Sequence, residues 1–352
     1  MSRHRVIPHD EKPGILRRRI ETWLKTLLGF LLMGGLIFAA LWAFNFSFQF
    51  KVGFWLAYPL LTVVGWWFSA QISLYMMKCV PADPNNPRDA RLIAIVDRVW
   101  KKTGLKYKPP VYISDNAMPN AFATGPIHSR AVVAATRGLF ECGMTDDEIE
   151  AVFAHELGHV YNYDVATNSL ISILSSVFFL VFDSGVRGWL ATIRWLRNML
   201  GLRPEQRILP PIVVTILSNL LGYAILWVSQ QLTKFIQLFV VRSRESGADA
   251  IGAHFTGNPC ALASALIKLV DYVEKHRPTG RDAELARVLR VCMTIDPLFD
   301  TVKAPPAPTT IWQKIVRFWQ DLQLTHPPVE ERVYQLERMN GGPCPLPNKN
   351  KF

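Results

Sequence analysis

The stretch AVFAHELGHVYNYD, residues 151–164, contains His155, Glu156 and His159 in the order H-E-x-x-H. Side chains four residues apart lie on the same face of an α-helix, so both imidazoles would point toward one place. Two ring nitrogens arranged in this way can bind one zinc ion, and the glutamate beside the first histidine can reach a water molecule on the metal. The stretch therefore predicts a helix with two metal ligands, His155 and His159, and a general base, Glu156.

The residues around this motif favour a helix. Thr145 is followed by Glu148 three positions later, the capping-box pattern, which predicts that the helix begins at about Asp146. Small and apolar residues surround the two histidines. A chance occurrence of the motif is the competing interpretation, and the position of the motif within an apolar, capped helix argues against it.

A catalytic zinc site needs a third protein ligand and an open position for water. Glu245 in VVRSRESGADAIGA, residues 240–253, is the candidate for that ligand. Asp249 follows it by four positions, so it would share the same helix face and could hold the second nitrogen of a ligating histidine. Spacing alone leaves open an ordinary ion pair between Glu245 and Arg242 or Arg244 on a solvated face.

Four segments without any charged residue make up much of the remaining chain. They cover residues 26–50, 52–77, 165–182 and 208–233. A helix needs roughly 20 apolar residues to cross about 30 Å of hydrocarbon, so the first, second and fourth segments are long enough and the third is borderline. The first segment is too long for a signal peptide and lacks a small-residue cleavage site, which predicts a retained anchor. We therefore expect about four transmembrane or membrane-associated helices.

The formal net charge of +11 is concentrated near the N-terminus, where seven Lys and Arg residues lie within residues 1–25. This pattern follows the positive-inside rule and predicts contact with membrane lipid. No basic stripe interleaved with aromatic residues occurs elsewhere, so we expect no nucleic-acid partner. The rule places residues 83–164 in the cytoplasm. The arginine-rich 183–207 loop fits the positive-inside rule poorly. We therefore expect either that this loop lies in the membrane interface or that the third and fourth apolar segments do not both span the bilayer.

Five cysteines are present, and no two of them form a C-x-x-C pair: Cys79, Cys142, Cys260, Cys292 and Cys344. An odd number without such spacing argues against a disulfide framework and against a cysteine-ligated metal. We therefore expect the soluble part of the chain to lie in a reducing compartment.

The chain resembles the HtpX-like membrane-bound zinc metalloproteases, whose peptidase family includes the CAAX prenyl endoproteases. Four stretches carry the resemblance, in this order: NAFATG (120–125), AVFAHELGHVYNYD (151–164), RSRESGAD (242–249) and THPPVEERVYQLE (325–337). Together with the apolar segments, they cover most of residues 20–340. The resemblance implies a mainly α membrane protein with a cytoplasmic α+β protease domain of the zincin type, similar to gluzincins. It also implies one Zn²⁺ per chain and a location in the bacterial inner membrane, with the active site facing the cytoplasm.

The resemblance and the segment pattern together divide the chain into six parts. These are a basic cytoplasmic N-terminus (1–25), two transmembrane helices (26–77), the first part of the protease domain (83–164), the third and fourth apolar segments with the arginine-rich loop (165–233), the second part of the protease domain (234–340) and a loose tail (341–352). Within the domain, apolar spacing predicts a helix over 88–104 and short strands over 109–114 and 129–136.

Site residues carry over from the family at matching positions. The resemblance implies zinc ligation by His155, His159 and Glu245, general-base catalysis by Glu156 and support of a ligating histidine by Asp249. Ser246 stands where the family pattern has a larger residue, a change that removes no ligand.

The resemblance also implies residues that bind the substrate. An edge strand would pair with the substrate backbone by strand addition, and it would contain Asn120, Ala121, Phe122 and Ala123. His326 and Arg332 would lie near the oxyanion of the transition state. The strand and the two residues each have a structural alternative. NAFATG could be a plain turn, His326 could be a helix-entry residue, and Arg332 could form a solvated ion pair with Glu331 or Asp321.

The expected function is zinc-dependent cleavage of membrane proteins or their cytoplasmic loops, in membrane-protein quality control. His159 is six residues before the third apolar segment and Glu245 twelve residues after the fourth, so the metal should lie near the membrane surface. A CAAX-type prenyl endoprotease would need a large intramembrane chamber, for which four segments are too few. A non-enzymatic scaffold with structural zinc would need a fourth Cys or His ligand, and a transporter would need ionisable residues within its spans.

Overall fold

The computed structural model describes residues 63–165, 211–276 and 326–347, together with isolated positions elsewhere in the chain. The chain separates into two compact units. The first unit comprises Met1–Leu27, Trp67–Asn168 and Val240–Phe352, and the second comprises Leu28–Trp66 and Ser169–Phe239. The H-E-x-x-H stretch and Glu245 both belong to the first unit, although about eighty residues of sequence separate them.

The first unit contains a four-stranded mixed sheet with the strand order β1-β2-β4-β3. Strands β2 and β4 are parallel, and the two outer pairs are antiparallel. The strands are β1 (Cys79–Pro81), β2 (Val111–Ser114), β3 (Ala121–Thr124) and β4 (Val132–Thr136). The sheet therefore has β3 at one edge, where β4 is its one partner strand among the described residues.

Both helices predicted in this part of the chain are present, and each begins after a residue whose side chain caps it. In α4 (Pro87–Thr103), the Asn86 side chain accepts a hydrogen bond from the Arg88 backbone, and Gly104 ends the helix in the left-handed conformation. In α6 (Asp146–Tyr161), the predicted capping box is present, with Thr145 and Glu148 each bonding the other's backbone N–H. The helix that carries H-E-x-x-H therefore starts at the predicted residue.

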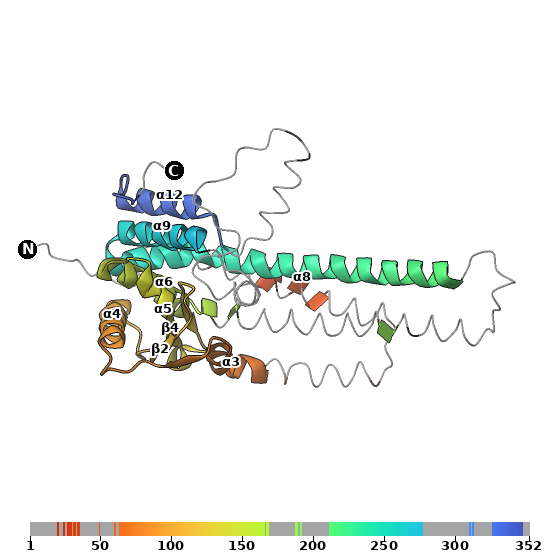
Figure 1. Cartoon of the computed structure of the whole chain (residues 1–352), viewed down its shortest axis with the longest axis horizontal. Coiled ribbons are helices and arrows are strands. Elements are labelled where there is room, and N and C mark those ends of the chain that lie inside the picture. Colours follow the sequence, from red (N-terminus) through yellow and green to blue (C-terminus); the bar gives the residue numbers. More distant parts are fainter. Residues whose placement is uncertain are drawn as a thin grey trace, which may run out of the picture. The chain divides into compact units, whose positions relative to one another are not determined.

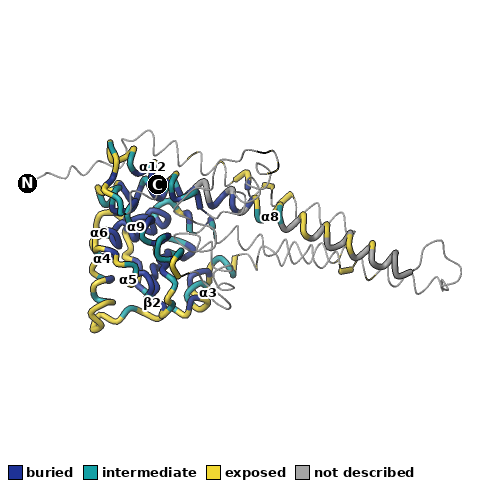
Figure 2. Tube along the Cα trace, turned by 45° about the horizontal axis from the view of Figure 1, so that its top comes forward, coloured by how far each residue is buried: buried dark blue, intermediate teal, exposed yellow. Residues whose placement is uncertain are grey.

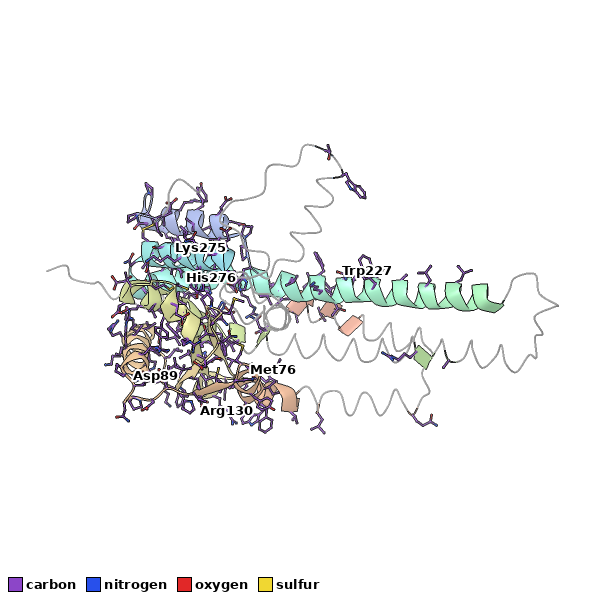
Figure 3. All side chains as sticks on the ribbon, viewed as in Figure 1. Met76, Asp89, Arg130, Trp227, Lys275 and His276 are labelled. Atoms are coloured by element: carbon purple, nitrogen blue, oxygen red, sulfur yellow. A yellow bond between two sulfur atoms is a disulfide. The ribbon has the colours of Figure 1, made fainter. Side chains whose placement is uncertain are left out.

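The remaining helices complete the first unit around α6. Figure 1 shows α12, α9 and α6 side by side, and α4 packs on another face of α6. The helices not yet given are α3 (Ser69–Met76), η1 (His128–Arg130), α5 (Arg137–Glu141), α8 (Pro211–Thr256), α9 (Pro259–Lys275) and α12 (Val329–Asn340). Only the part of α8 from Val240 onward belongs to the first unit. Arg130, labelled in Figure 3, lies over the Trp67 ring with 4.2 Å between the guanidinium carbon and the ring centre.

The core of this unit forms around α6. Every residue of α6 from Glu148 to Val160 is buried, and apolar side chains from α4, α9, α12 and the sheet pack against it. Figure 2 shows the buried residues gathered around α6 and α9, whereas α4 has exposed positions along its outer side. The H-E-x-x-H motif thus lies on a central, rigidly packed helix rather than on a surface element.

A disulfide between Cys260 and Cys344 overturns the expectation that the cysteines form no such bond. It joins the beginning of α9 to the segment after α12, and the two Cα atoms are 5.3 Å apart. The sequence separation of 84 residues gives no hint of the pair, because only the packing of α9 against α12 brings these ends together. Cys344 is fully buried, so residues 341–347 are held on the core, which differs from the loose tail expected over 341–352.

Within the parts of the chain that the structure describes, no helix has both the length and the apolar composition needed to cross a bilayer. Most of the predicted segment 26–50 and all but a few residues of 165–182 lie outside the described residues, whereas 63–77 and 211–233 of the other two segments are described. The basic N-terminus, residues 1–25, and the arginine-rich 183–207 loop also lie almost entirely outside the described residues.

Candidate metal centre

His155, His159 and Glu245 lie together in the interior of the first unit. Each offers one ligand atom, and these atoms all lie within 4.8 Å of one another. The two histidines come from successive turns of α6, and Glu245 comes from the part of α8 that belongs to the same unit. Among the described residues, no fourth His, Cys, Asp or Glu belongs to the group, so it matches three protein ligands with one open position.

The distances within this group fit a tetrahedral ion. Two ligand atoms at about 2.0–2.1 Å from a tetrahedral metal are about 3.4 Å apart. Nε2 of His155 is 3.6 Å from Oε2 of Glu245, and Nε2 of His159 is 3.4 Å from Oε1. Oε2 of Glu245 is buried and has no hydrogen-bond partner in the described part of the chain. A buried carboxylate oxygen without a partner is costly unless a cation binds there, so the residues fit a metal ion.

A carboxylate lies behind each histidine. Nδ1 of His155 is 2.8 Å from Oδ1 of Asp249, and Nδ1 of His159 is 3.0 Å from Oδ2 of Asp164. For His159, whose Nδ1 hydrogen-bonds Asp164, this acceptor favours the tautomer in which Nε2 carries the lone pair toward the metal, while Asp249 faces Nδ1 of His155 as a close negative charge. The structure places Asp249 where it was expected. Sequence reasoning missed Asp164, although it ends the same H-E-x-x-H stretch five residues after His159.

Each of these carboxylates also pairs with a buried arginine. Arg332 binds Asp249 through two hydrogen bonds of 2.9 and 2.7 Å, and Arg244 donates to Asp164 over 2.5 Å. The buried charges at the centre are four carboxylates and two guanidinium groups: Glu156, Asp164, Glu245, Asp249, Arg244 and Arg332. They leave a formal charge of minus two, which one divalent cation would neutralise.

Glu156 lies between the histidines and the edge strand. Its Oε2 accepts a 3.1 Å hydrogen bond from the backbone N–H of Ala123 in β3. Burial raises the pKa of Glu156, and the charge of Glu245 adds to this, although His155 and His159 act in the opposite direction. A carboxylate with a raised pKa is a stronger base, which suits a group that must take a proton from water.

The predicted substrate strand is present as β3. Ala121 to Thr124 form the strand, and Asn120 just before it exchanges hydrogen bonds with Thr136. The plain-turn alternative for this stretch is therefore wrong. Asn120, Ala121 and Phe122 are buried, and Ala123 is half-buried. The hydrogen bond from Ala123 to Glu156 places the strand beside the candidate metal ligands.

His326 and Arg332 also lie at this centre. Nε2 of His326 is 3.7 Å from Oε2 of Glu245, and Nη1 of Arg332 is 4.0 Å from the same oxygen. Both side chains are buried, so the solvated ion pair considered for Arg332 is excluded. The structure thus brings all the sequence-predicted site residues to one region of the first unit.

Two glycines allow α6 and α8 to approach closely. A Cβ added at Gly158 would lie 3.1 Å from the Ala248 carbonyl oxygen. One added at Gly252 would lie 2.8 Å from the His155 nitrogen and 2.9 Å from its Cα. The obstacles are backbone atoms, which cannot rotate away. The absence of both side chains is therefore what lets Glu245 reach the histidines.

We expect Gly252→Ala to weaken zinc binding and to lower the free energy of unfolding by about 1–3 kcal/mol, because the two helices must separate. Equilibrium unfolding and competition with a chromophoric chelator measure the two effects. Gly247→Ala on the same helix is the control, since its Cβ would meet only the Asn162 side chain at 3.7 Å. The control should keep wild-type zinc affinity, and an equal affinity in Gly252→Ala would contradict the close-approach argument.

Comparison with known proteins agrees with this geometry. Residues 86–340 match the model of peptidase family M48. A Protease HtpX homolog from Tropheryma whipplei is 32% identical over 325 residues, which cover 92% of this chain and 97% of that protein. Another from Campylobacter concisus is 35% identical over 212 residues, or 60% of this chain and 67% of that protein.

A solved structure is also similar to the chain. The crystal structure of S. mikatae Ste24p aligns with a TM-score of 0.45 and 18% identity, over 90% of this chain and 67% of that one. The family model covers well over half of the sequence and includes every candidate site residue. The resemblance to HtpX-like proteases is confirmed: the chain belongs to peptidase family M48 and is a protease of that family.

Proposed function

We propose that this protease is an integral-membrane zinc metalloendopeptidase that cleaves membrane proteins or their cytoplasmic loops. The observation that carries the proposal is the group of His155, His159 and Glu245, with Glu156 beside it and β3 next to Glu156. Two imidazoles and one carboxylate are the donor set of catalytic zinc in several peptidases. One Zn²⁺ per chain would supply Lewis acidity, which makes water a competent nucleophile near neutral pH.

The chain's own residues would perform the proton transfers. Glu156 takes a proton from the attacking water and delivers it to the leaving amine, as a general base and then a general acid. The N–H of Ala123 binds one carboxylate oxygen of Glu156, which restrains the orientation of this group beside the candidate metal ligands. As the edge strand of the sheet, β3 is the element along which an extended peptide would bind as an added strand.

The developing charge on the substrate carbonyl needs donors in place before the reaction. His326 and Arg332 are buried close to Glu245 and are the candidates. Two hydrogen bonds to Asp249 occupy Nε and Nη2 of Arg332, while Nη1 lies on the Glu245 side. Such fixed donors stabilise an oxyanion more strongly in a buried site than in water.

The position of the site in the sequence supports membrane substrates. His159 and Glu245 come within six and twelve residues of uncharged segments, so the site would lie near the bilayer surface. The basic N-terminus favours a cytoplasmic orientation, in the inner membrane if the source is bacterial, whereas the Cys260–Cys344 disulfide is a bond more typical of an oxidising compartment. Quality control of damaged membrane proteins is the biological role that we propose for this placement.

A cleavage assay with the full chain in lipid vesicles tests the proposal. One substrate is a membrane protein with a cytoplasmic loop, and the other is the same loop as a soluble peptide. We expect faster cleavage of the membrane-inserted substrate, loss of activity with a zinc chelator and recovery when Zn²⁺ is restored. Cleavage that persists after chelation overturns the metal-dependent mechanism, and equal rates on both substrates overturn the membrane preference.

A further inference from the structure

We propose that Arg244 is a positioning residue of the metal centre, which acts through Asp164 to hold His159 in its ligating orientation. The inference depends on the proposed metal centre but not on any particular substrate. Arg244 is only 1% exposed, and it precedes the candidate ligand Glu245 by one residue. Spacing alone had made it a possible surface partner of Glu245, a role that its burial excludes.

Asp164 connects the arginine to the histidine. Its Oδ1 accepts from Nη1 of Arg244 over 2.5 Å, and its Oδ2 is 3.0 Å from Nδ1 of His159. Each carboxylate oxygen therefore has its own partner, and the plane of the carboxylate is fixed from both ends. With Arg244 in place, Oδ2 faces the imidazole, and Nε2 of His159 faces Glu245.

The local backbone conformation before Asp164 does not by itself favour the placement of Asp164 beside His159. Tyr163 adopts φ of 60°, a left-handed conformation that is unfavourable for a residue with a large side chain. The backbone turns at residues 162 and 163, after the end of α6 at Tyr161, and Oδ2 of Asp164 lies 3.0 Å from Nδ1 of His159. The Tyr163 ring stacks on His128 with 3.9 Å between ring centres. Contacts from other elements, among them the ion pair with Arg244, thus hold a turn that the local sequence disfavours.

The other histidine has the same arrangement. Arg332 binds Asp249, and Asp249 lies at Nδ1 of His155. Both ligating imidazoles are thus backed by a buried carboxylate that a buried guanidinium neutralises, and the two arginines come from different helices, α8 and α12. If the two arginine–aspartate ion pairs served only to join helices, we would not expect the aspartate to contact a candidate metal ligand in both of them.

Neutralisation explains why an arginine is needed behind each aspartate. Without Arg244, Asp164 would be a buried carboxylate that, within the described part of the chain, keeps the His159 imidazole as its one ionisable partner. It would reorient toward water or toward other donors, because an uncompensated buried charge is strongly unfavourable. His159 would then lose the acceptor that fixes its ring. The consequence is a looser metal site, with all three ligands still present in the sequence.

Zinc affinity of the purified full chain, measured by competition with a chromophoric chelator, tests this inference without any substrate. We expect Arg244→Met to lower zinc affinity by about 10–100-fold, which is typical for loss of a group behind a metal ligand. Arg244→Lys keeps the charge but not the planar geometry, so its zinc affinity should be intermediate between that of Arg244→Met and that of wild type. The visible absorption of the Co²⁺-substituted protein should change in the same order, because it reports the ligand geometry.

A double variant separates a positioning role from a structural one. Asp164→Asn removes the group through which Arg244 acts, so adding Arg244→Met should change zinc affinity by less than about twofold. The double variant also lacks the buried Asp164 charge that Arg244→Met alone would leave unpaired. It therefore keeps the test valid if Arg244→Met alone fails to fold. Arg98→Met is the matched control, because Arg98 binds Glu150 on the far side of α6 and has no link to a histidine.

The outcomes are distinct from those of the cleavage assay. The inference is overturned if Arg244→Met binds zinc with wild-type affinity. It is also overturned if the losses of zinc affinity caused by Arg244→Met and Asp164→Asn multiply in the double variant. The same is true if Arg98→Met weakens zinc binding as much as Arg244→Met does. A wild-type chain that binds zinc as expected but cleaves no membrane protein overturns the proposed function alone.

Discussion

Glu156→Gln is expected to lower kcat/KM for peptide cleavage by about 10²–10⁴-fold while the chain still binds one zinc ion. Glutamine has nearly the same shape as glutamate, so the packing between α6 and β3 should persist. It cannot accept a proton, however, and both proton transfers of the proposed mechanism pass through this carboxylate. The N–H of Ala123 can still donate to the amide oxygen, which preserves the local backbone.

Activity and metal content must be measured on the same preparation of Glu156→Gln. A zinc stoichiometry near that of wild type shows that the loss is chemical rather than structural. Glu150→Gln is the matched control, since Glu150 lies on the same helix but binds Arg98 and Lys102 away from the histidines. The control should keep its cleavage rate. Wild-type cleavage by Glu156→Gln would rule out Glu156 as the general base.

The local parts of the site were predictable from the sequence. The beginning of α6 at Asp146 follows from the capping box, and the shared face of His155 and His159 follows from helical spacing. Asp249 was placed behind a histidine because it follows Glu245 by four residues on one helix. Each of these inferences needs only residues within a turn or two of each other, where helix geometry alone decides the arrangement.

The partners of the two aspartates were not predictable in this way. Arg244 is 80 residues from Asp164, and Arg332 is 83 residues from Asp249. Their pairing depends on how α8 and α12 pack against the rest of the unit. A sequence shows arginines in abundance but not which of them is buried. Burial also reverses the interpretation of Arg332, which on spacing alone could have been a solvated surface residue.

The closeness of α6 and α8 could not be predicted either. Gly252 has an ordinary negative φ within a helix, so no turn or cap explains it, and glycine there weakens helix propensity. Its role, which is to let α8 approach the His155 backbone, becomes clear only from the folded structure. The disulfide between Cys260 and Cys344 belongs to the same class, because helix packing brings together two residues that spacing leaves unrelated.

The second large effect is expected for Glu245→Gln, which should abolish tight zinc binding. The variant replaces the only carboxylate among the three candidate ligands with a neutral amide of the same size. It also removes one of the two negative charges that a divalent cation would neutralise at this centre. Two imidazoles without the third ligand are too few to hold zinc in a catalytic site.

Zinc-induced stabilisation is the best measure of this loss. A ligand at 1,000 times its Kd stabilises the folded state by about 4 kcal/mol, so wild type should show a large rise in Tm when zinc is added. Glu245→Gln should show almost none. The shift is taken between zinc-free and zinc-loaded samples of each variant, so any effect of the substitution on the fold itself cancels.

Glu148→Gln is the matched control for Glu245→Gln. Glu148 is also a buried glutamate with a cationic partner, but it binds Lys268 and Ser264 at the junction of α6 and α9. Its loss should lower the stability of the zinc-free protein, because the pKa of Glu148 is lowered despite the opposing effect of burial, which shows that its partners favour the charged form. The zinc-induced shift should remain. If Glu245→Gln also kept that shift, the metal would be held by other groups, and α8 would have no part in binding it.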